Sequence, residues 1–191
     1  MRFLVISGTP KHEGLCDSCV KAVLEGAKSE GVSVEVERVC DKPIARCAMC
    51  EDGWGDCQKK HTCRFGEDGF TDLQRRIAQA DAVALVTPVY WWEMTESMKA
   101  FFDRFRRCEA TRGEKGAMAG KTVLLVASPG GSGNGMLSCL EQMERLCRHL
   151  RARIFDYIGV NRWNKDYKLT AIRSAAKAIA SGKIPDDIIR I

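Results

Sequence analysis

The stretch RFLVISGTPKHEGLC, residues 2–16, decides the fold class of this chain. Its first six residues, RFLVIS, contain a continuous apolar run of four between an arginine and a serine, which is the pattern of a short strand buried on both faces. Gly8 ends the run, and apolar residues then recur at helical spacing between Val20 and Ala27. A buried strand followed directly by a helix favours a parallel sheet.

The same alternation of strand and helix continues along the chain. Further strands are expected at VSVEVERV (32–39), DAVALVTP (81–88), KTVLLVASP (121–129) and ARIFDYIGV (152–160). Further helices are expected at FTDLQRRIAQA (70–80), TESMKAFFDRFRR (95–107), residues 136–150 and DYKLTAIRSAAKAIASGK (166–183). The second strand alternates apolar and charged residues, which indicates a place near a sheet edge. Together these elements predict a single α/β domain over residues 1–191, with a doubly wound five-stranded parallel sheet covered by helices on both faces.

Composition and charge exclude several classes of protein. With 45% hydrophobic and 29% charged residues, the chain resembles soluble globular proteins. No apolar run approaches the roughly 20 residues that span a bilayer, and the run before Gly8 is too short for the core of a signal peptide. We therefore expect a cytoplasmic protein without a membrane partner. The net charge of +5 is modest and mostly dispersed, which argues against a nucleic-acid partner.

One stretch, RFRRCEATRGEK at residues 104–115, concentrates basic residues. Because it also contains two glutamates, we interpret it as a solvated helix end and loop. The alternative is a docking patch for an acidic redox partner or for a nucleotide phosphate.

Ligands of such sheets bind beyond the carboxyl ends of the strands, so the loops after the first, third and fourth strands are candidates. The first, SGTPKHEGLC, offers the hydroxyls of Ser7 and Thr9, the charge of Lys11 and a helix start at Leu15 and Cys16. The free backbone amides and the dipole at the start of a helix favour binding of an anion. The loop lacks the glycine spacing of dinucleotide sites and the GK[ST] of nucleoside triphosphatases, which favours a mononucleotide. The alternative is an ordinary capped turn.

The other two loops suit a flat ligand. TPVYWWEMT places Trp91 and Trp92 just past a strand, where exposed aromatic rings are costly unless they cover something, such as a planar ring system. SPGGSGNG contains four glycines, which let the backbone approach a ligand edge. The alternatives are aromatic packing against neighbouring loops or another subunit, and a flexible connection.

Four cysteines lie within RCAMCEDGWGDCQKKHTC, residues 46–63, in the pattern C-x2-C-x6-C-x5-C. In a reducing compartment such density indicates metal or redox chemistry. Three interpretations stay open: an iron–sulfur cluster, a structural zinc site with His61 as a possible substitute ligand, or unligated thiols. Cys40 is a spare candidate ligand. A further pair, Cys16 and Cys19 in CDSC, is interpreted as reduced thiols beside the phosphate position.

Together the three loops resemble those of the flavodoxin-like NAD(P)H-dependent FMN reductases. ISGTPKHEG is similar to that family's phosphate loop, and TPVYWWEMTESMKAFFDR is similar to its TPVY and K-x-F-x-DR segment. The resemblance implies that FMN binds with its phosphate at the first loop and its ring between the other two. The implied FMN-binding residues are Ser7, Thr9, Pro10, Lys11, Leu15 and Cys16 at the phosphate, and Pro88, Val89, Tyr90, Trp91, Trp92, Ser128, Gly130, Gly131 and Ser132 around the ring.

A branch of this family, the iron–sulfur flavoproteins, carries a compact cysteine motif between the second strand and the second helix. The cysteine-rich insertion here, at about residues 40–66, lies at that place. Its middle spacing is four residues longer than in the branch pattern, around DGWG, where Gly53 and Gly55 would let the loop fold back. The resemblance implies that Cys47, Cys50, Cys57 and Cys63 ligate a 4Fe–4S cluster.

The function implied is that of an FMN-dependent oxidoreductase and electron-transfer flavoprotein. It would move electrons between ferredoxin or NAD(P)H and a quinone, flavin or oxygen-species acceptor, as a homodimer or homotetramer. The cofactors would carry the chemistry, so no catalytic side chain is expected. The alternatives are a metal-free NAD(P)H-dependent FMN or quinone reductase and a non-enzymatic flavin-binding electron carrier.

Overall fold

The computed structural model describes residues 1–184 and contains one sheet of five parallel strands in the order β2-β1-β3-β4-β5. Its strands are β1 (Arg2–Ser7), β2 (Ser33–Arg38), β3 (Ala82–Val89), β4 (Thr122–Pro129) and β5 (Arg153–Gly159). Each predicted strand is confirmed to within one residue at either end. The chain first runs outward from β1 to β2 and then returns to the other side of β1, so the strand order switches between β1 and β3.

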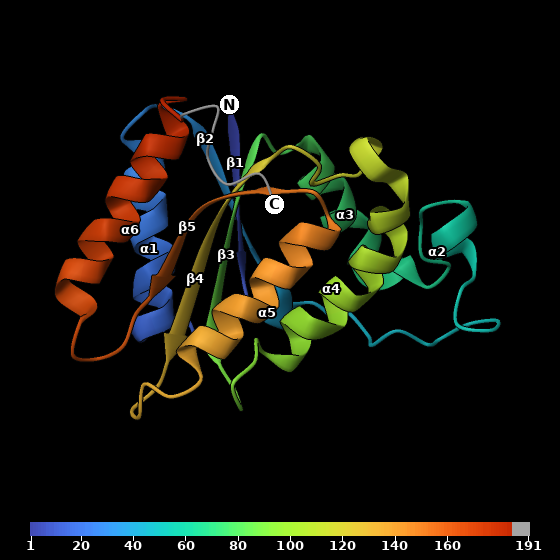
Figure 1. The fold of residues 1–191 in the computed structure, drawn as a ribbon, viewed down its shortest axis with the longest axis horizontal. Helices are drawn as coiled ribbons and strands as arrows, with labels where there is room; N and C mark the ends of the chain where they lie inside the picture. The colour runs from blue at the N-terminus through green and yellow to red at the C-terminus, as the bar shows by residue number, and fades with distance from the viewer. Residues whose placement is uncertain (185–191) are drawn as a thin grey trace.

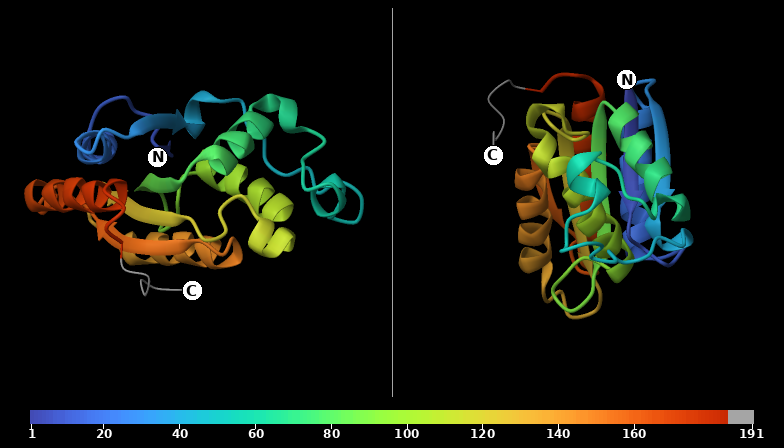
Figure 2. Two further views of the ribbon diagram at one scale, coloured as in Figure 1. Left: turned by 90° about the horizontal axis from the view of Figure 1, so that it is seen from above. Right: turned by 90° about the vertical axis from the view of Figure 1, so that its right-hand side faces the viewer.

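Helices cover both faces of this sheet (Figures 1 and 2). They are α1 (Leu15–Lys28), α2 (Asp56–Lys59), α3 (Phe70–Gln79), α4 (Glu96–Glu109), α5 (Met136–His149) and α6 (Lys165–Ala180). Helices α1 and α6 pack on one face, and α3, α4 and α5 pack on the other. The five predicted helices and the doubly wound, flavodoxin-like architecture are confirmed, whereas the short helix α2 was not predicted.

Burial follows the apolar pattern of each strand. Every residue of β4 is buried, and β3 is buried as far as Thr87. Strand β2 alternates exposed and half-buried residues and lies at the edge, as its sequence indicated. The predicted domain of residues 1–191 includes residues 185–191, which lie outside the described part, so its extent stays a prediction. None of the helices within residues 1–184 is long and apolar enough to cross a membrane.

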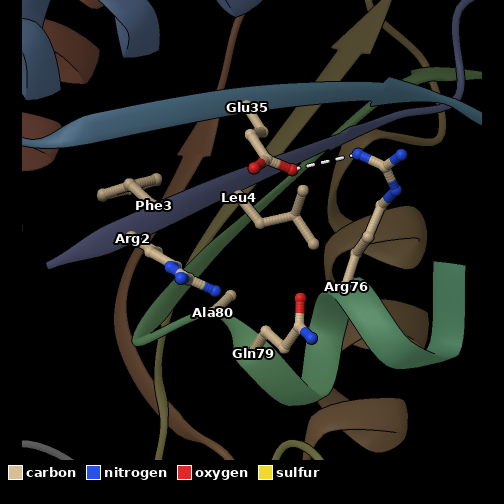
Figure 3. A pocket seen from close by; sticks show the side chains of 7 residues that line it. All are labelled: Arg2, Phe3, Leu4, Glu35, Arg76, Gln79 and Ala80. Carbon is tan, nitrogen blue, oxygen red and sulfur yellow. Dashed lines mark hydrogen bonds and ion pairs between the residues drawn. The ribbon is translucent and has the colours of Figure 1, made fainter.

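At the amino ends of the strands, a hollow of about 250 Å³ lies between α3 and the starts of β1 and β2 (Figure 3). Arg76 points across it and pairs with Glu35 at 3.2 Å and with Glu37 at 3.1 Å. These pairs tie α3 to the edge strand. The hollow lies at the opposite end of the sheet from the predicted binding loops.

The layer of α1 and α6 depends on a glycine. A Cβ atom at Gly26 would lie 2.2 Å from the carbonyl oxygen of Arg173, which belongs to α6. The absence of a side chain therefore lets the two helix backbones approach closely.

We predict that Gly26→Ala destabilises the protein by about 1–2 kcal/mol or more, because the overlap with the α6 backbone outweighs the roughly 1 kcal/mol that alanine gains in helix propensity. The measurement is urea unfolding of flavin-free protein. Gly130→Ala is the control, since a Cβ there meets no described atom within 4 Å, and its stability should be unchanged or higher by up to about 1 kcal/mol. Equal midpoints for Gly26→Ala and the parent would contradict the close approach.

Candidate functional site

The first loop is joined to β3 and α4 at Gly8. The Gly8 carbonyl accepts hydrogen bonds from the Thr95 hydroxyl at 2.9 Å and from the Cys40 thiol at 3.2 Å. A Cβ atom at Gly8 would lie within 2.9 Å of side-chain atoms of Thr87, Thr95 and Met98. This close packing brings the first loop against the second, and neither Gly8 nor Thr95 was singled out from the sequence.

Side chains of the first loop divide between anchoring and exposed positions. Ser7 and Thr9 are buried, and Thr9 exchanges hydrogen bonds of 3.3 Å with the backbone of Lys11. Pro10 and Lys11 are exposed, and in residues 1–184 the Lys11 ammonium group has no ion-pair partner. Within the same range, no side chain caps the start of α1, so its first amides stay available to an anion.

An acidic residue in the first turn of α1 is neutralised by neighbouring cations. Asp17 is buried and accepts a hydrogen bond from Arg38. It also forms an ion pair with Lys21, whose ammonium nitrogen lies 2.9 Å from a carboxylate oxygen of Asp17. Burial alone would raise the pKa of Asp17, but the bonds from Lys21 and Arg38 outweigh it and hold the pKa below its ordinary value. Arg38 also donates to the Lys11 carbonyl at 3.5 Å. Arg38 therefore supports the first loop. The sequence of its strand did not indicate this role.

The second loop is a tight turn at the end of β3. The backbones of Tyr90 and Glu93 exchange two hydrogen bonds of 2.9 Å around Trp91 and Trp92. Both tryptophans have positive φ angles, 49° and 66°, which cost a non-glycine residue about 1–2 kcal/mol each. Their side chains are 86% and 51% exposed. A strained, exposed pair of aromatics at the end of a strand is typical of a ligand-binding position.

The third loop packs against this aromatic turn. Gly135 has a positive φ of 76°, and a Cβ atom there would lie 2.7 Å from the Cα atom of Trp92. The Met94 amide, at the end of the second loop, donates to Gln142 of α5 at 2.9 Å. Ser128 is buried beside Pro88 in the sheet register, while Gly130, Gly131 and Ser132 are exposed.

The three loops predicted from the sequence thus lie together at one edge, at the bottom of Figure 1. Of the residues expected at the ring, Ser128 is buried, whereas the others, Pro88, Val89 and Tyr90 among them, are half-buried or exposed at this edge. A fourth loop, after β5, was missed: Trp163 is 64% exposed there and packs beside Gly133 of the third loop. Which of these side chains contact FMN stays a prediction.

The second candidate site is a hollow outside the sheet. Cys47, Cys50, Cys57 and Cys63 all line it. Helix α4 forms the opposite wall with three further residues, Arg104, Arg107 and Cys108. The cysteine segment lies beyond α4 at the right of Figure 1, and α2 packs against that helix. The structure therefore gathers all four predicted ligands and adds a fifth thiol, Cys108.

The long middle spacing folds back as its glycines predicted. Gly53 has a positive φ of 90°, and a Cβ atom at Gly55 would lie 2.8 Å from the Cys50 sulfur. Arg107 of α4 donates to the Gly53 carbonyl and stacks 4.8 Å from the ring centre of Trp54. The insertion DGWG is thus fixed to α4 rather than left free.

Arg104 corrects our interpretation of residues 104–115 as a solvated helix end. It is 3% exposed, and Cys108 and Glu109 in the same stretch are also buried. Arg104 pairs with Asp68 at 2.5 Å and donates to the Cys63 sulfur at 3.3 Å. Burial would raise the pKa of Asp68, but bonds from Arg104 and from two backbone amides outweigh it and lower the pKa.

Other candidate ligands lie apart from this hollow. The His61 ring contacts the Cys108 carbonyl at 3.1 Å, and Cys40 lies at the first loop. As they are placed in residues 1–184, no three His, Cys, Asp or Glu side chains form a ready metal-binding group.

The two cysteines of CDSC lie at the buried side of α1. Cys16 and Cys19 are both buried, and burial raises the pKa of both thiols, that of Cys19 to about 12. Burial also raises the pKa values of Cys139 and Cys147 to about 12. These four thiols are protonated at neutral pH and act as small apolar residues.

Comparison with known proteins places the chain in a family. The sequence model of NADPH-dependent FMN reductases matches residues 1–162. Because this match covers most of the chain, the protein belongs to that family, as its loops indicated.

Among curated relatives are two iron–sulfur flavoproteins. The one from Archaeoglobus fulgidus is 33% identical over 104 residues, which are 54% of this chain and 45% of that protein. The one from Methanosarcina thermophila is 28% identical over 139 residues, 71% of this chain and 66% of that protein. The chain thus spans less than two thirds of either relative.

Solved structures support the fold. A flavone reductase superposes with a TM-score of 0.73 at 17% identity, over 95% of this chain and 62% of that one. An NAD(P)H:quinone oxidoreductase from Methanothermobacter marburgensis gives a TM-score of 0.70 at 17% identity, over 94% and 96% of the two chains.

We predict that Lys11→Glu weakens FMN binding by at least about 1 kcal/mol, because it places a negative charge beside the phosphate. The measurement is fluorescence titration of flavin-free protein with FMN. Lys28→Glu, at the far end of α1, makes the same change in net charge and should bind FMN as the parent does. If Lys11→Glu also binds as the parent does, the phosphate assignment is wrong.

Proposed function

We propose that this protein is an FMN-dependent oxidoreductase that also carries a 4Fe–4S cluster. The observation that carries the proposal is the gathering of four cysteines in one hollow against α4, the helix whose start closes the flavin loops. Family membership supports FMN, and the names of the relatives support the cluster. As supporting evidence for the fit, the lining of the hollow supplies four soft sulfur ligands and three guanidinium groups, those of Arg64, Arg104 and Arg107, that would offset the charge of thiolates.

At the flavin edge, the chain's own residues would bind and orient FMN. The amides of α1 and the Lys11 side chain would hold the phosphate. Trp91 would cover one part of the ring, and the backbone around Gly130 and Gly131 would border another. FMN exchanges two electrons together or singly, whereas a 4Fe–4S cluster passes single electrons.

At the hollow, Cys47, Cys50, Cys57 and Cys63 would ligate the cluster. Arg104 lies nine residues beyond Thr95 along α4, roughly 13 Å at about 1.5 Å per residue. Helix α4 thus links the first loop to the hollow, and its residues would hold the two groups in one subunit of a homodimer or homotetramer.

This arrangement suits a protein that links a one-electron donor such as ferredoxin, or NAD(P)H, to a quinone, flavin or oxygen-species acceptor. The second candidate is a metal-free NAD(P)H-dependent FMN or quinone reductase. The match to the model of NADPH-dependent FMN reductases supports it. Iron and sulfide analysis separates the two.

We predict that Trp91→Gly raises the fluorescence of bound flavin and shifts its reduction potential, because the ring loses its cover. Flavin-free protein should be as stable as the parent or more stable by up to about 1 kcal/mol, since glycine relieves the positive φ. The measurements are flavin fluorescence, redox titration and urea unfolding. Trp54→Ala, in the cysteine segment, is the control that leaves flavin fluorescence unchanged. If the flavin fluorescence and reduction potential of Trp91→Gly equal those of the parent, Trp91 does not cover the flavin and the aromatic turn serves for packing.

For the cluster, we predict about four irons and four sulfides per chain in anaerobically purified protein, with a broad visible absorbance beyond the flavin bands. Cys50→Ser and Cys57→Ser should lose the iron and keep FMN, because the phosphate loop is separate. Cys139→Ala, a buried cysteine of α5, should keep both. Equal iron in the Cys50 and Cys57 variants and the parent would refute the ligand assignment, and stoichiometric zinc without sulfide would indicate a structural site instead.

A further inference from the structure

Arg104 is a buried cation whose two terminal nitrogens both have partners around the cysteine hollow. Its side chain is 2% exposed and belongs to α4. One terminal nitrogen donates to the Ala45 carbonyl at 3.0 Å and to Asp68 at 2.5 Å. The other donates to the Phe65 carbonyl at 2.8 Å and to the Cys63 sulfur at 3.3 Å.

These partners bracket the cysteine segment. Ala45 precedes the first of the four cysteines, and Phe65 and Asp68 follow the last. Arg104 therefore holds both ends of the segment against α4 and fixes the Cys63 sulfur between them. A lysine could not do this, because one ammonium group lacks the planar fork that reaches four partners.

Arg107, one turn further along α4, provides a comparison. It lines the same hollow but donates to the Gly53 carbonyl and stacks on Trp54. Among the described residues, a hydrogen bond to a cysteine sulfur is found for Arg104 and not for Arg107. Arg64 lines the hollow as well, but it is paired with Glu51 and Asp56. Arg104 and Arg107 thus belong to one helix and line one hollow, and they differ in contact with a thiol ligand.

We propose that Arg104 is a positioning residue that fixes Cys63 as a cluster ligand and raises the reduction potential of the cluster. The inference rests on the proposed function. A reduced cluster carries one more negative charge than an oxidised one, so a nearby cation with an N–H bond to a ligand sulfur stabilises the reduced form more. Asp68 offsets part of the charge of Arg104, but the hydrogen bond to sulfur remains.

The experiment uses anaerobically purified, cluster-loaded protein and follows the cluster by EPR during a redox titration. Arg104→Gln removes the charge and the bond to sulfur and leaves Asp68 uncompensated. Arg107→Gln removes a charge from the same hollow without removing a bond to sulfur. The double variant Arg104→Gln with Asp68→Asn removes one charge of each sign, so the local net charge is unchanged. Iron and FMN content are measured for every variant.

We expect the midpoint potential to fall in Arg104→Gln by more than in Arg107→Gln. The midpoint potential should also be lower than that of the parent in the double variant, because the bond to sulfur is lost there while the local net charge is unchanged. FMN content should be unchanged throughout. If Arg104→Gln loses its iron, Arg104→Lys, which keeps the charge, provides the comparison and should also show a lowered potential.

Several outcomes would overturn the inference. Potentials equal to the parent, or a shift no larger than that of Arg107→Gln, would show that Arg104 does not tune the cluster. Loss of iron from both Arg104→Gln and Arg104→Lys would show that Arg104 only stabilises the structure of the cysteine segment. In each case an iron-loaded parent leaves the proposed function standing, whereas a parent without iron and sulfide would refute both.

Discussion

Close packing around Gly8 is the constraint on which the carboxyl edge of this sheet depends. Side chains from β3 and α4 occupy the place where a Cβ atom would lie, and Thr95 bonds to the Gly8 carbonyl. The start of α4 is thereby fixed against the first loop. Because Arg104 and Arg107 lie further along the same rigid helix, this contact also sets the position of the cysteine hollow relative to the flavin edge. A side chain at Gly8 would therefore disturb both candidate sites.

Local rules of sequence and structure are broken at both candidate sites. Trp91 and Trp92 adopt left-handed backbone conformations that favour glycine, and both stay exposed. Arg104 carries a charge into the protein interior. Such conflicts are expected where function rather than stability selects the residue. The buried thiols of Cys16, Cys139 and Cys147, in contrast, follow the apolar pattern of their helices, so their environment separates them from the cysteines of the hollow.

Apolar periodicity was sufficient to predict the strands, the five long helices and the edge position of β2. The reason is that the spacing of apolar residues follows directly from which faces of a strand or helix are buried. The loops followed from the rule that ligands bind at the carboxyl edge. The role of Arg104 could not be predicted, since a basic helix stretch gives no sign of Asp68, a partner 36 residues away. Arg38 was missed for the same reason. Periodicity indicates which face of an element is buried, but it does not indicate which distant residue neutralises a charged side chain on that face.

The four cysteines reach one hollow through different contacts with α4. Cys57 lies in α2 and is buried, and Cys63 is bonded to Arg104. Cys50 lies in a turn beside Gly55, where a Cβ atom would lie 2.8 Å from its sulfur, and Arg107 holds the neighbouring Gly53 to α4. Cys47 lies in the irregular stretch after Ala45, whose carbonyl is bonded to Arg104. The long middle spacing is therefore not slack: it forms a loop, anchored to α4, that folds Cys50 back toward the other cysteines, which accounts for four thiols that line one hollow.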